Sequence, residues 1–207
     1  HGIEGSNAFS GTFMPDRSDA STRQPVPTGK LRVIQQRCQT TDDEPRWLVA
    51  LISDTGMRLS EAAGLSKEDV HLDADIPYVE IRPHKWRRLK TKSSIRKLPL
   101  VGASLWAARQ ASIASNSPFM FPRYCNETEC QSNSASAALN KWLKTVAGAD
   151  YVIHSFRHSM RDRLRAVECP SDIIDQIGGW TTTGIGHAYG KGYSVEILAK
   201  WMEKIEC

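Results

Sequence analysis

The chain has 207 residues, which is enough for one domain of ordinary size or at most two small ones. Hydrophobic residues make up 40% and charged residues 24%, so the chain can bury a core and is not expected to be disordered. No run of roughly 18 apolar residues occurs, which excludes a membrane-spanning helix. The formal net charge of +4 is too small to indicate nucleic-acid binding by itself.

The cysteines indicate reduced thiols. Five are present, and an odd number is poor evidence for a disulfide framework. Only Cys125 and Cys130 are close in sequence, and no second pair stands at zinc-finger spacing. The N-terminal residues lack the basic-then-apolar order of a secretory signal. We therefore expect a cytoplasmic protein.

Residues 1–29 are rich in Gly, Ser, Thr, Pro and Asp and predict an extended lead-in or linker. From residue 28 the pattern becomes helical, with Leu31, Val33 and Ile34 along one side. A second helix begins within residues 42–45, carries a buried stripe, and ends at residues 55–56. A short helix follows over 58–65, and Ser66 with Asp69 has the spacing of a capping pair.

The period then changes from helical to alternating. Residues 78–81 and 96–100 predict two strands joined by a basic turn. Helices are expected over 103–115, 134–147, 154–167, 171–177 and 194–205, and the last has an apolar face that includes Leu198 and Trp201. The sequence thus predicts a mixed α+β fold, mainly α-helical, with a small antiparallel sheet (the basic β-hairpin) beside a helical bundle.

Positive charge is concentrated in the hairpin. Residues 82–97 contain eight cations and no acid, which leaves a net −4 for the rest of the chain. Such a cluster is typical of a surface that neutralises a polyanion, although a merely solvated hairpin is the alternative. No apolar face accompanies it, which favours a phosphate backbone over a membrane. The DNA contacts that we predict are Arg87, Arg88, Lys92 and Arg96, with Arg161 from a second basic cluster in the helix over 154–167.

Several polar residues are candidates for chemistry. Arg58 follows a helix break, where backbone N–H groups and a guanidinium together suit an anionic oxygen. His154 and Arg157 are one helical turn apart and project to one face. His154 and His158 have the spacing of a metal pair, but the Glu of the metalloprotease signature is missing, so no metal or cofactor is expected.

Five segments, in order, resemble the tyrosine recombinase family of the phage integrase type. Residues 54–62 (DTGMRLSEA) resemble the family's first-arginine segment, residues 90–100 (KTKSSIRKLPL) its lysine-bearing hairpin, and residues 154–158 (HSFRH) its His-x-x-Arg motif. Trp180 stands where the family carries His or Trp, and Tyr189 lies at the family's usual distance for the nucleophile. The resemblance implies an integrase-like catalytic domain over 30–207, without the family's N-terminal core-binding domain.

The resemblance also implies a metal- and ATP-independent phosphoryl transfer. Arg58 and Arg157 would hold the non-bridging oxygens of a phosphodiester. Tyr189 would attack the phosphorus and form a 3′-phosphotyrosine link. Tyr193 is the alternative nucleophile, although it precedes the last helix and suits a packing role.

The remaining roles concern protons. Lys90 would protonate the 5′-oxygen as general acid, with Lys92 left open as the alternative. His154 would accept or steer the tyrosine proton, and Trp180 would donate its indole N–H to a phosphate oxygen.

Recombination implies double-stranded DNA with attachment or core sites as partner, and a homotetramer assembled on it inside a bacterial host. The isolated domain is expected to be monomeric, and its last helix would dock either on a neighbour or on its own domain. A type IB topoisomerase-like strand transferase and a non-catalytic DNA-binding module remain alternatives.

Overall fold

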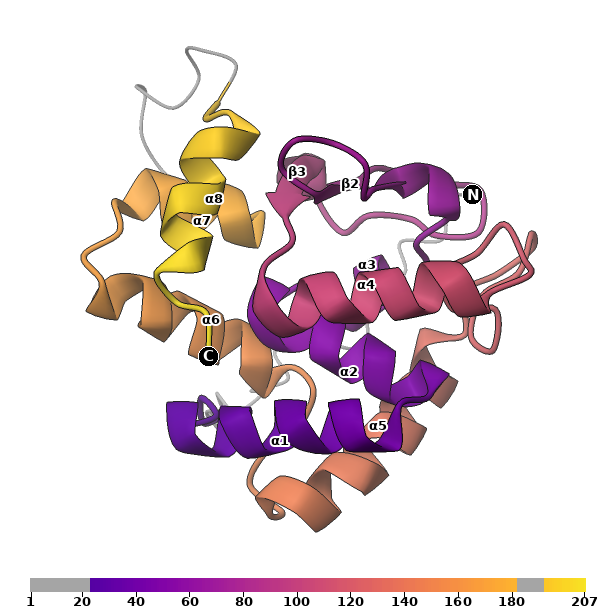
Figure 1. Cartoon of the computed structure of the whole chain (residues 1–207). Coiled ribbons are helices and arrows are strands. Elements are labelled where there is room, and N and C mark those ends of the chain that lie inside the picture. Colours follow the sequence, from indigo (N-terminus) through magenta and orange to yellow (C-terminus); the bar gives the residue numbers. More distant parts are fainter. Residues whose placement is uncertain (1–22, 182–191) are drawn as a thin grey trace, which may run out of the picture.

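The computed structural model describes residues 23–181 and 192–207. These residues form a mainly helical domain with one small sheet, as the sequence predicts (Figure 1). The helices and strands are α1 (Thr28–Thr41), α2 (Glu44–Thr55), α3 (Leu59–Ala63), η1 (Lys67–Asp69), β1 (Val70–His71), β2 (Tyr78–Ile81), η2 (Lys92–Ser94), β3 (Arg96–Pro99), α4 (Gly102–Ala114), α5 (Ser132–Ala147), α6 (Ser155–Ala166), α7 (Ser171–Gly178) and α8 (Val195–Glu203).

The sheet is antiparallel in the order β1-β2-β3. The predicted pair is present, with Val79 opposite Leu98 and Ile81 opposite Arg96. Strand β1 was not predicted, because its two residues are too few to show an alternating pattern. Helices α7 and α8 pack against β3, so the hairpin is fixed to the C-terminal helices.

Helix α2 lies at the centre of the core and packs against α1, α4 and α6. Asp43 caps its N-terminus by accepting a hydrogen bond from the Arg46 N–H (3.1 Å), and Pro45 occupies an early position that tolerates a missing donor. At its other end Gly56 adopts φ 59°, which glycine accepts without a steric cost. All residues from Leu48 to Thr55 are buried.

Most of the predicted apolar faces are confirmed. Leu31 and Ile34 of α1 are fully buried, and so are Leu198 and Met202 of α8. The prediction that Val33 shares the buried side of α1 is wrong, since its side chain is 47% exposed. Residues two apart on a helix point about 200° apart, so Val33 could not share the face of Leu31.

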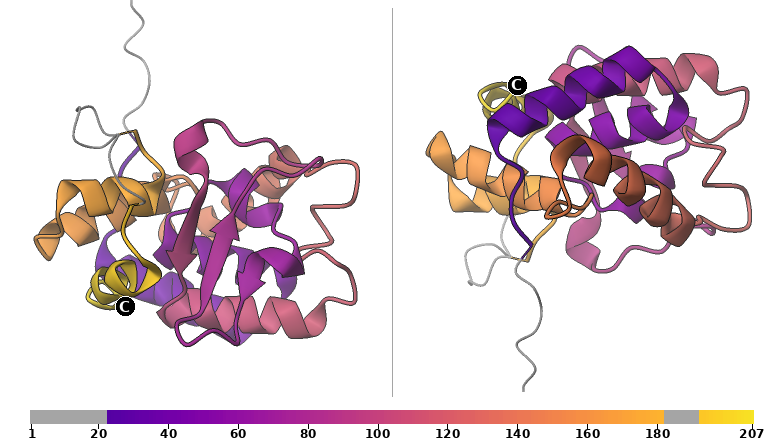
Figure 2. Two further views of the ribbon diagram at one scale, coloured as in Figure 1. Left: turned by 90° about the horizontal axis from the view of Figure 1, so that it is seen from above. Right: turned by 90° about the horizontal axis from the view of Figure 1, so that it is seen from below.

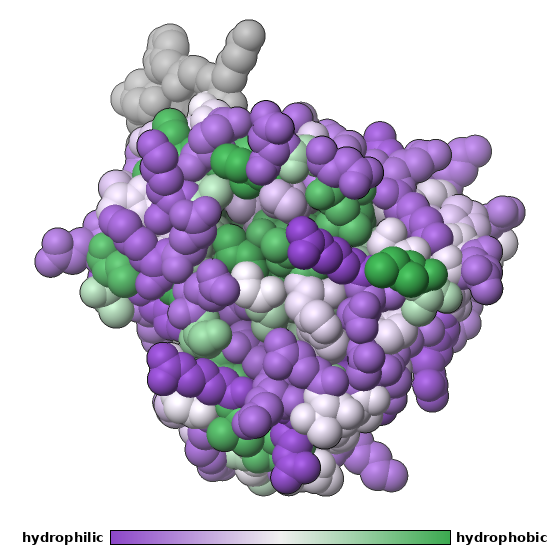
Figure 3. Space-filling view, in the orientation of Figure 1, coloured by the Kyte–Doolittle hydropathy of each residue, from purple (hydrophilic) through white to green (hydrophobic). Residues whose placement is uncertain are grey.

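The hairpin and α1 lie on opposite sides of the molecule (Figures 1 and 2). Hydrophilic side chains cover most of the face in Figure 3, and hydrophobic ones form small groups between them. None of the described helices is long and apolar enough to span a membrane.

Candidate active site

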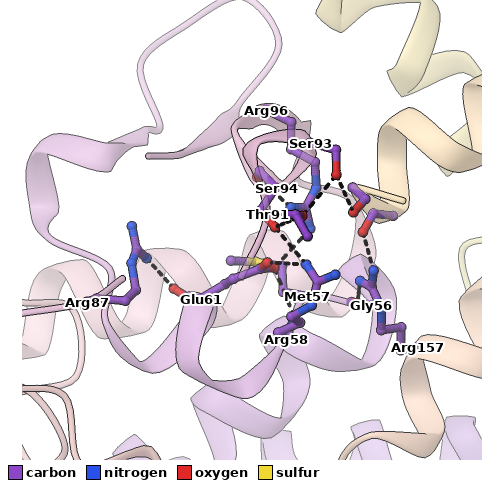
Figure 4. Close-up of polar contacts among 12 residues, drawn as sticks. Gly56, Met57, Arg58, Glu61, Arg87, Thr91, Ser93, Ser94, Arg96 and Arg157 are labelled. Carbon is purple, nitrogen blue, oxygen red and sulfur yellow. Dashed lines mark hydrogen bonds and ion pairs between the residues drawn. The ribbon is translucent and has the colours of Figure 1, made fainter. Parts of the chain in front are cut away.

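Glu61 connects Arg58 to the sheet. Its buried carboxylate accepts hydrogen bonds from Arg58 Nη1 (2.7 Å) and from the Arg58 backbone N–H (3.0 Å). Arg96 of β3 donates to the same carboxylate at 3.0 Å (Figure 4). Burial alone raises the pKa of Glu61, but the charge and hydrogen bonds of Arg96 and the hydrogen bonds of Arg58 lower it below the ordinary value. Glu61 therefore stays ionised and fixes the Arg58 side chain.

Arg157 joins the α2–α3 turn to the end of α7. Its Nη1 donates to the Gly56 carbonyl at 3.0 Å, and its Nη2 donates to the Gly178 carbonyl. Glycine suits this position, because its φ is 59° and a Cβ here would lie 3.0 Å from the Met160 Cβ of α6. The turn that presents Arg58 is thus held against the helix that carries Arg157.

Among the described residues, Arg58, Arg96 and Arg157 lie near a single carboxylate, that of Glu61. Burial first, and then the charges of Arg58 and Arg96, lower the pKa of Arg157 to about 9, so it is still protonated at neutral pH. Arg58, Arg96 and Arg157 with Glu61 leave an excess of positive charge. An anion such as a phosphate would relieve that excess.

The tip of the hairpin folds onto this group. Ser94 is buried, and its hydroxyl accepts a hydrogen bond from Arg58 Nη1 at 3.0 Å and contacts the Thr91 hydroxyl at 3.0 Å. The Ser93 hydroxyl lies 3.3 Å from that of Thr181, just beyond α7. Lys90 and Lys92, on either side of Thr91, are both exposed. The backbone segment that carries both candidate lysines is thus connected to Arg58 through Thr91 and Ser94, while the lysine side chains face solvent.

His154 lies at the N-terminal end of α6, one turn from Arg157. Its side chain is exposed, but desolvation by the surrounding protein, followed by the charges of Arg23, His158, Arg157 and Arg58, lowers its pKa to about 4. The imidazole is therefore neutral at pH 7 and can accept a proton. His158 lies beside it, with ring centroids 5.4 Å apart, but among the described residues no group of three or more potential metal ligands occurs.

Trp180 packs on the same arginine. Its ring lies 4.2 Å from the Arg157 guanidinium carbon and 4.7 Å from that of Arg161. Gly178 makes room for it, because a Cβ there would lie 1.9 Å from the Trp180 ring. Arg161 is partly exposed and forms an ion pair with Asp175 at 3.7 Å.

Two of the predicted DNA contacts are buried. Arg87 donates to the carbonyls of Glu61 and Arg82, and Arg96 donates to the Ile177 carbonyl (2.8 Å) as well as to Glu61. Arg157 is also buried and bonded to backbone carbonyls, but it forms no ion pair with any described residue, whereas Arg96 pairs with Glu61. We therefore propose that Arg87 and Arg96 position the hairpin, and we keep Arg157 as the candidate for binding phosphate. Arg88 and Lys92 are exposed.

Of the two candidate nucleophiles, Tyr189 lies outside the described residues. The Tyr193 hydroxyl donates to the Asp172 carboxylate, and this hydrogen bond raises its pKa. Asp172 is in the first turn of α7, six residues or about 9 Å along the helix from the Gly178 carbonyl that binds Arg157. The Tyr193 hydroxyl is thus held at the far end of α7, while its backbone N–H and carbonyl bond to the Gln176 side chain at 2.8 Å each. Its side chain is 36% exposed, so the packing role stays a prediction.

Glu61 and Ser94, which hold the Arg58 side chain, were not identified from the sequence. The signal for Glu61 is its spacing of three from Arg58, which places both on one face of a first helical turn. No local pattern identifies Ser94, because its partner is 36 residues away.

The model of the phage integrase family matches residues 30–192. The chain belongs to the phage integrase family. The three segments that resemble this family in sequence, around Arg58, over residues 90–100 and around Arg157, lie together in the structure. Comparison with curated protein sequences gives no match.

Solved structures show the same fold. The Tn1549 transposon integrase, in complex with circular intermediate DNA, is 17% identical with a TM-score of 0.58, over 82% of this chain and 66% of that one. The XerA recombinase is 16% identical with a TM-score of 0.55, over 93% and 62%. The XerH site-specific recombinase bound to its difH substrate is 17% identical with a TM-score of 0.52, over 87% and 51%. The present chain thus spans between half and two thirds of these proteins.

Proposed function

We propose that this protein is a site-specific DNA recombinase that cuts and rejoins double-stranded DNA through a 3′-phosphotyrosine, in the integration and excision of phage or prophage DNA. One observation carries the proposal most directly. Arg58 and Arg157 are both fixed to the turn around Gly56, with the lysine-bearing tip of the hairpin packed on Arg58 through Ser94 (Figure 4). Two fixed guanidinium groups suit the oxygens of a pentacoordinate phosphorus.

The proposed reaction needs neither a metal nor ATP. Arg58 and Arg157 stabilise the charge on the non-bridging oxygens while Tyr189 attacks the phosphorus. The neutral imidazole of His154 accepts the tyrosine proton. Lys90 protonates the leaving 5′-oxygen, with Lys92 as the alternative, and Trp180 donates its indole N–H to a phosphate oxygen. Because the covalent link retains the energy of the ester, a 5′-hydroxyl can reverse the reaction.

The proposed partner is duplex DNA with attachment or core sites, contacted by Arg88, Lys92 and Arg161. The Tn1549 integrase and XerH structures are complexes with DNA, which supports this assignment. Strand exchange joins two duplexes, so we propose a homotetramer on DNA, acting in the cytoplasm of a bacterial host at the nucleoid. We propose residues 30–207 as the catalytic domain.

A nicked suicide duplex tests the proposal, because loss of the short product strand traps the covalent intermediate. The wild type, Tyr189→Phe and Tyr193→Phe would each be incubated with a pool of labelled duplexes of varied core sequence, and the products separated on a denaturing gel. We expect a covalent protein–DNA band from the wild type and from Tyr193→Phe, and none from Tyr189→Phe.

The other outcomes are equally informative. A band lost only with Tyr193→Phe would contradict the assigned nucleophile and leave the reaction class standing. DNA retention in a native gel without any covalent band would favour the non-catalytic binding module. Relaxation of a supercoiled plasmid that lacks paired sites would favour a topoisomerase-like strand transferase.

A further inference from the structure

Cys125 and Cys130 lie directly opposite each other beside α3. Their backbones form an isolated antiparallel bridge around the turn over residues 126–129. Two hydrogen bonds flank the bridge, from the Asn126 N–H to the Glu129 carbonyl (3.1 Å) and from the Gln131 N–H to the Tyr124 carbonyl (2.7 Å). The cysteines are therefore the non-hydrogen-bonded pair of this bridge, the arrangement in which opposite side chains come closest.

This geometry is compatible with a disulfide. Opposite residues of a non-hydrogen-bonded pair have Cα atoms about 4.5 Å apart, at the lower end of the roughly 4.4–6.8 Å that disulfides span. Both side chains leave the same face of the bridge. The backbone hydrogen bonds already hold the pair in place, so oxidation requires little rearrangement of the turn.

The two thiols differ in reactivity. Cys125 is buried, whereas Cys130 is partly exposed and its sulfur lies 3.9 Å from the Ser60 carbonyl of α3. A hydrogen bond from the Cys125 thiol lowers the pKa of Cys130, with a further contribution from the nearby charge of Arg87. The same hydrogen bond raises the pKa of Cys125. Because Cys130 is the more exposed of the two thiols and the thiolate is the nucleophile, we expect Cys130 to react first.

We propose that Cys125 and Cys130 form a reversible intramolecular disulfide when the protein meets a peroxide. The Cys130 thiolate attacks one oxygen of hydrogen peroxide, the O–O bond breaks, and the other oxygen leaves as water after taking up a proton. Cys125 then attacks the sulfur of the Cys130 sulfenic acid, and the S–O bond breaks with loss of a second water. Two thiols are oxidised to one disulfide and the peroxide is reduced to two waters.

The pair is not explained as part of a metal site. Within the described residues no group of three or more His, Cys, Asp or Glu side chains could hold an ion. None of the residues assigned to the proposed phosphoryl transfer takes part in the disulfide, so this inference does not depend on the proposed function.

Mass spectrometry of the whole chain tests the proposal directly. Trypsin releases residues 124–141 as one peptide that contains both cysteines, while Cys38, Cys169 and Cys207 fall in other peptides. After treatment with stoichiometric hydrogen peroxide and alkylation under denaturing conditions, we expect this peptide unalkylated and lighter by two hydrogen atoms, with the other cysteines alkylated. Dithiothreitol should restore alkylation at both positions.

Single variants test the order of events. In Cys125→Ser, the sulfenic acid on Cys130 has no resolving thiol and should be trapped by dimedone, whereas Cys130→Ser should give little trapping at Cys125. Cys169→Ser is the matched control and should still form the disulfide. Full alkylation of both cysteines after peroxide treatment would overturn the proposal, as would their pairing with other cysteines. Trapping confined to Cys125 would overturn the assigned order.

Discussion

Glu61 shows how one buried carboxylate can determine where two cations lie. It is 2% exposed and pairs with Arg58 and Arg96, whose backbones belong to different parts of the fold. A buried ion pair costs desolvation when it forms, so it is weak evidence for stability. Removal of the Glu61 charge, however, leaves the buried guanidinium of Arg96 without a counter-charge. Glu61 therefore contributes more to the positions of Arg58 and Arg96 than to the net stability of the fold.

Glu61→Gln keeps the shape of the side chain and removes its charge. We expect the free energy of unfolding to fall by about 3 kcal/mol, because Arg96 would be left buried and unpaired. Urea denaturation measures this change. Glu68→Gln is the control, since the Glu68 side chain is 85% exposed in its pair with Arg82 and should change stability by less than about 0.5 kcal/mol. Equal effects of the two substitutions would contradict the role of Glu61.

His154 predicts a pH dependence of stability. Its pKa is about 4 in the folded chain, whereas an unfolded chain has a His pKa of about 6.5. As the pH falls from about 6.5 to about 4, the unfolded state binds the proton first, so the folded state loses stability. His154→Gln should remove this part of the acid sensitivity. Denaturation midpoints of both proteins across this pH range measure the difference, and parallel curves would show that the His154 pKa is not lowered.

At the level of elements, the end of α7 is where several parts of the fold meet. The carbonyls of Ile177 and Gly178 accept hydrogen bonds from Arg96 and Arg157, respectively. Cations at a helix C-terminus also interact favourably with the helix dipole. Trp180 then packs on the Arg157 guanidinium in space that the Gly178 backbone leaves open. A strand and two helices are joined at this point.

Gly178→Ala should disturb this junction. The new Cβ would lie 1.9 Å from the Trp180 ring, which must move away from Arg157. We expect a loss of about 1–3 kcal/mol of stability and a changed near-ultraviolet circular dichroism spectrum. Gly29→Ala in α1 is the control, because a Cβ there meets nothing within 4 Å and should stabilise the helix slightly. An unchanged spectrum for Gly178→Ala would contradict the packing described here.

Across the whole molecule, the hairpin and α1 lie on opposite sides (Figures 1 and 2). Replacing both Arg88 and Lys92 with Ala should lower the slope of log Kd against log salt for duplex DNA by about two. Arg32→Ala with Arg37→Ala is the control, since both side chains are exposed on α1. Fluorescence anisotropy over a range of salt concentrations measures both slopes. Equal losses would mean that DNA is not confined to the hairpin side.

Sequence periodicity predicted most of the fold, because helices and strands with one buried face carry that face in their spacing. It could not separate the buried arginines of the hairpin from the exposed ones. Arg88 and Arg96 look alike in sequence, and the burial of Arg96 depends on Glu61, 35 residues away. The family resemblance indicated the Arg58 and Arg157 segments, but their connection through the Gly56 backbone became visible only in three dimensions.

The bond from Arg157 to the Gly56 carbonyl also has an evolutionary consequence. The acceptor is a main-chain oxygen. A substitution at position 56 can therefore change the separation of Arg58 and Arg157 only by changing the conformation of the turn. A substitution at position 56, 58 or 157 therefore changes the surroundings of the other two residues. We expect descendants of this gene to keep the three positions together or to lose them together.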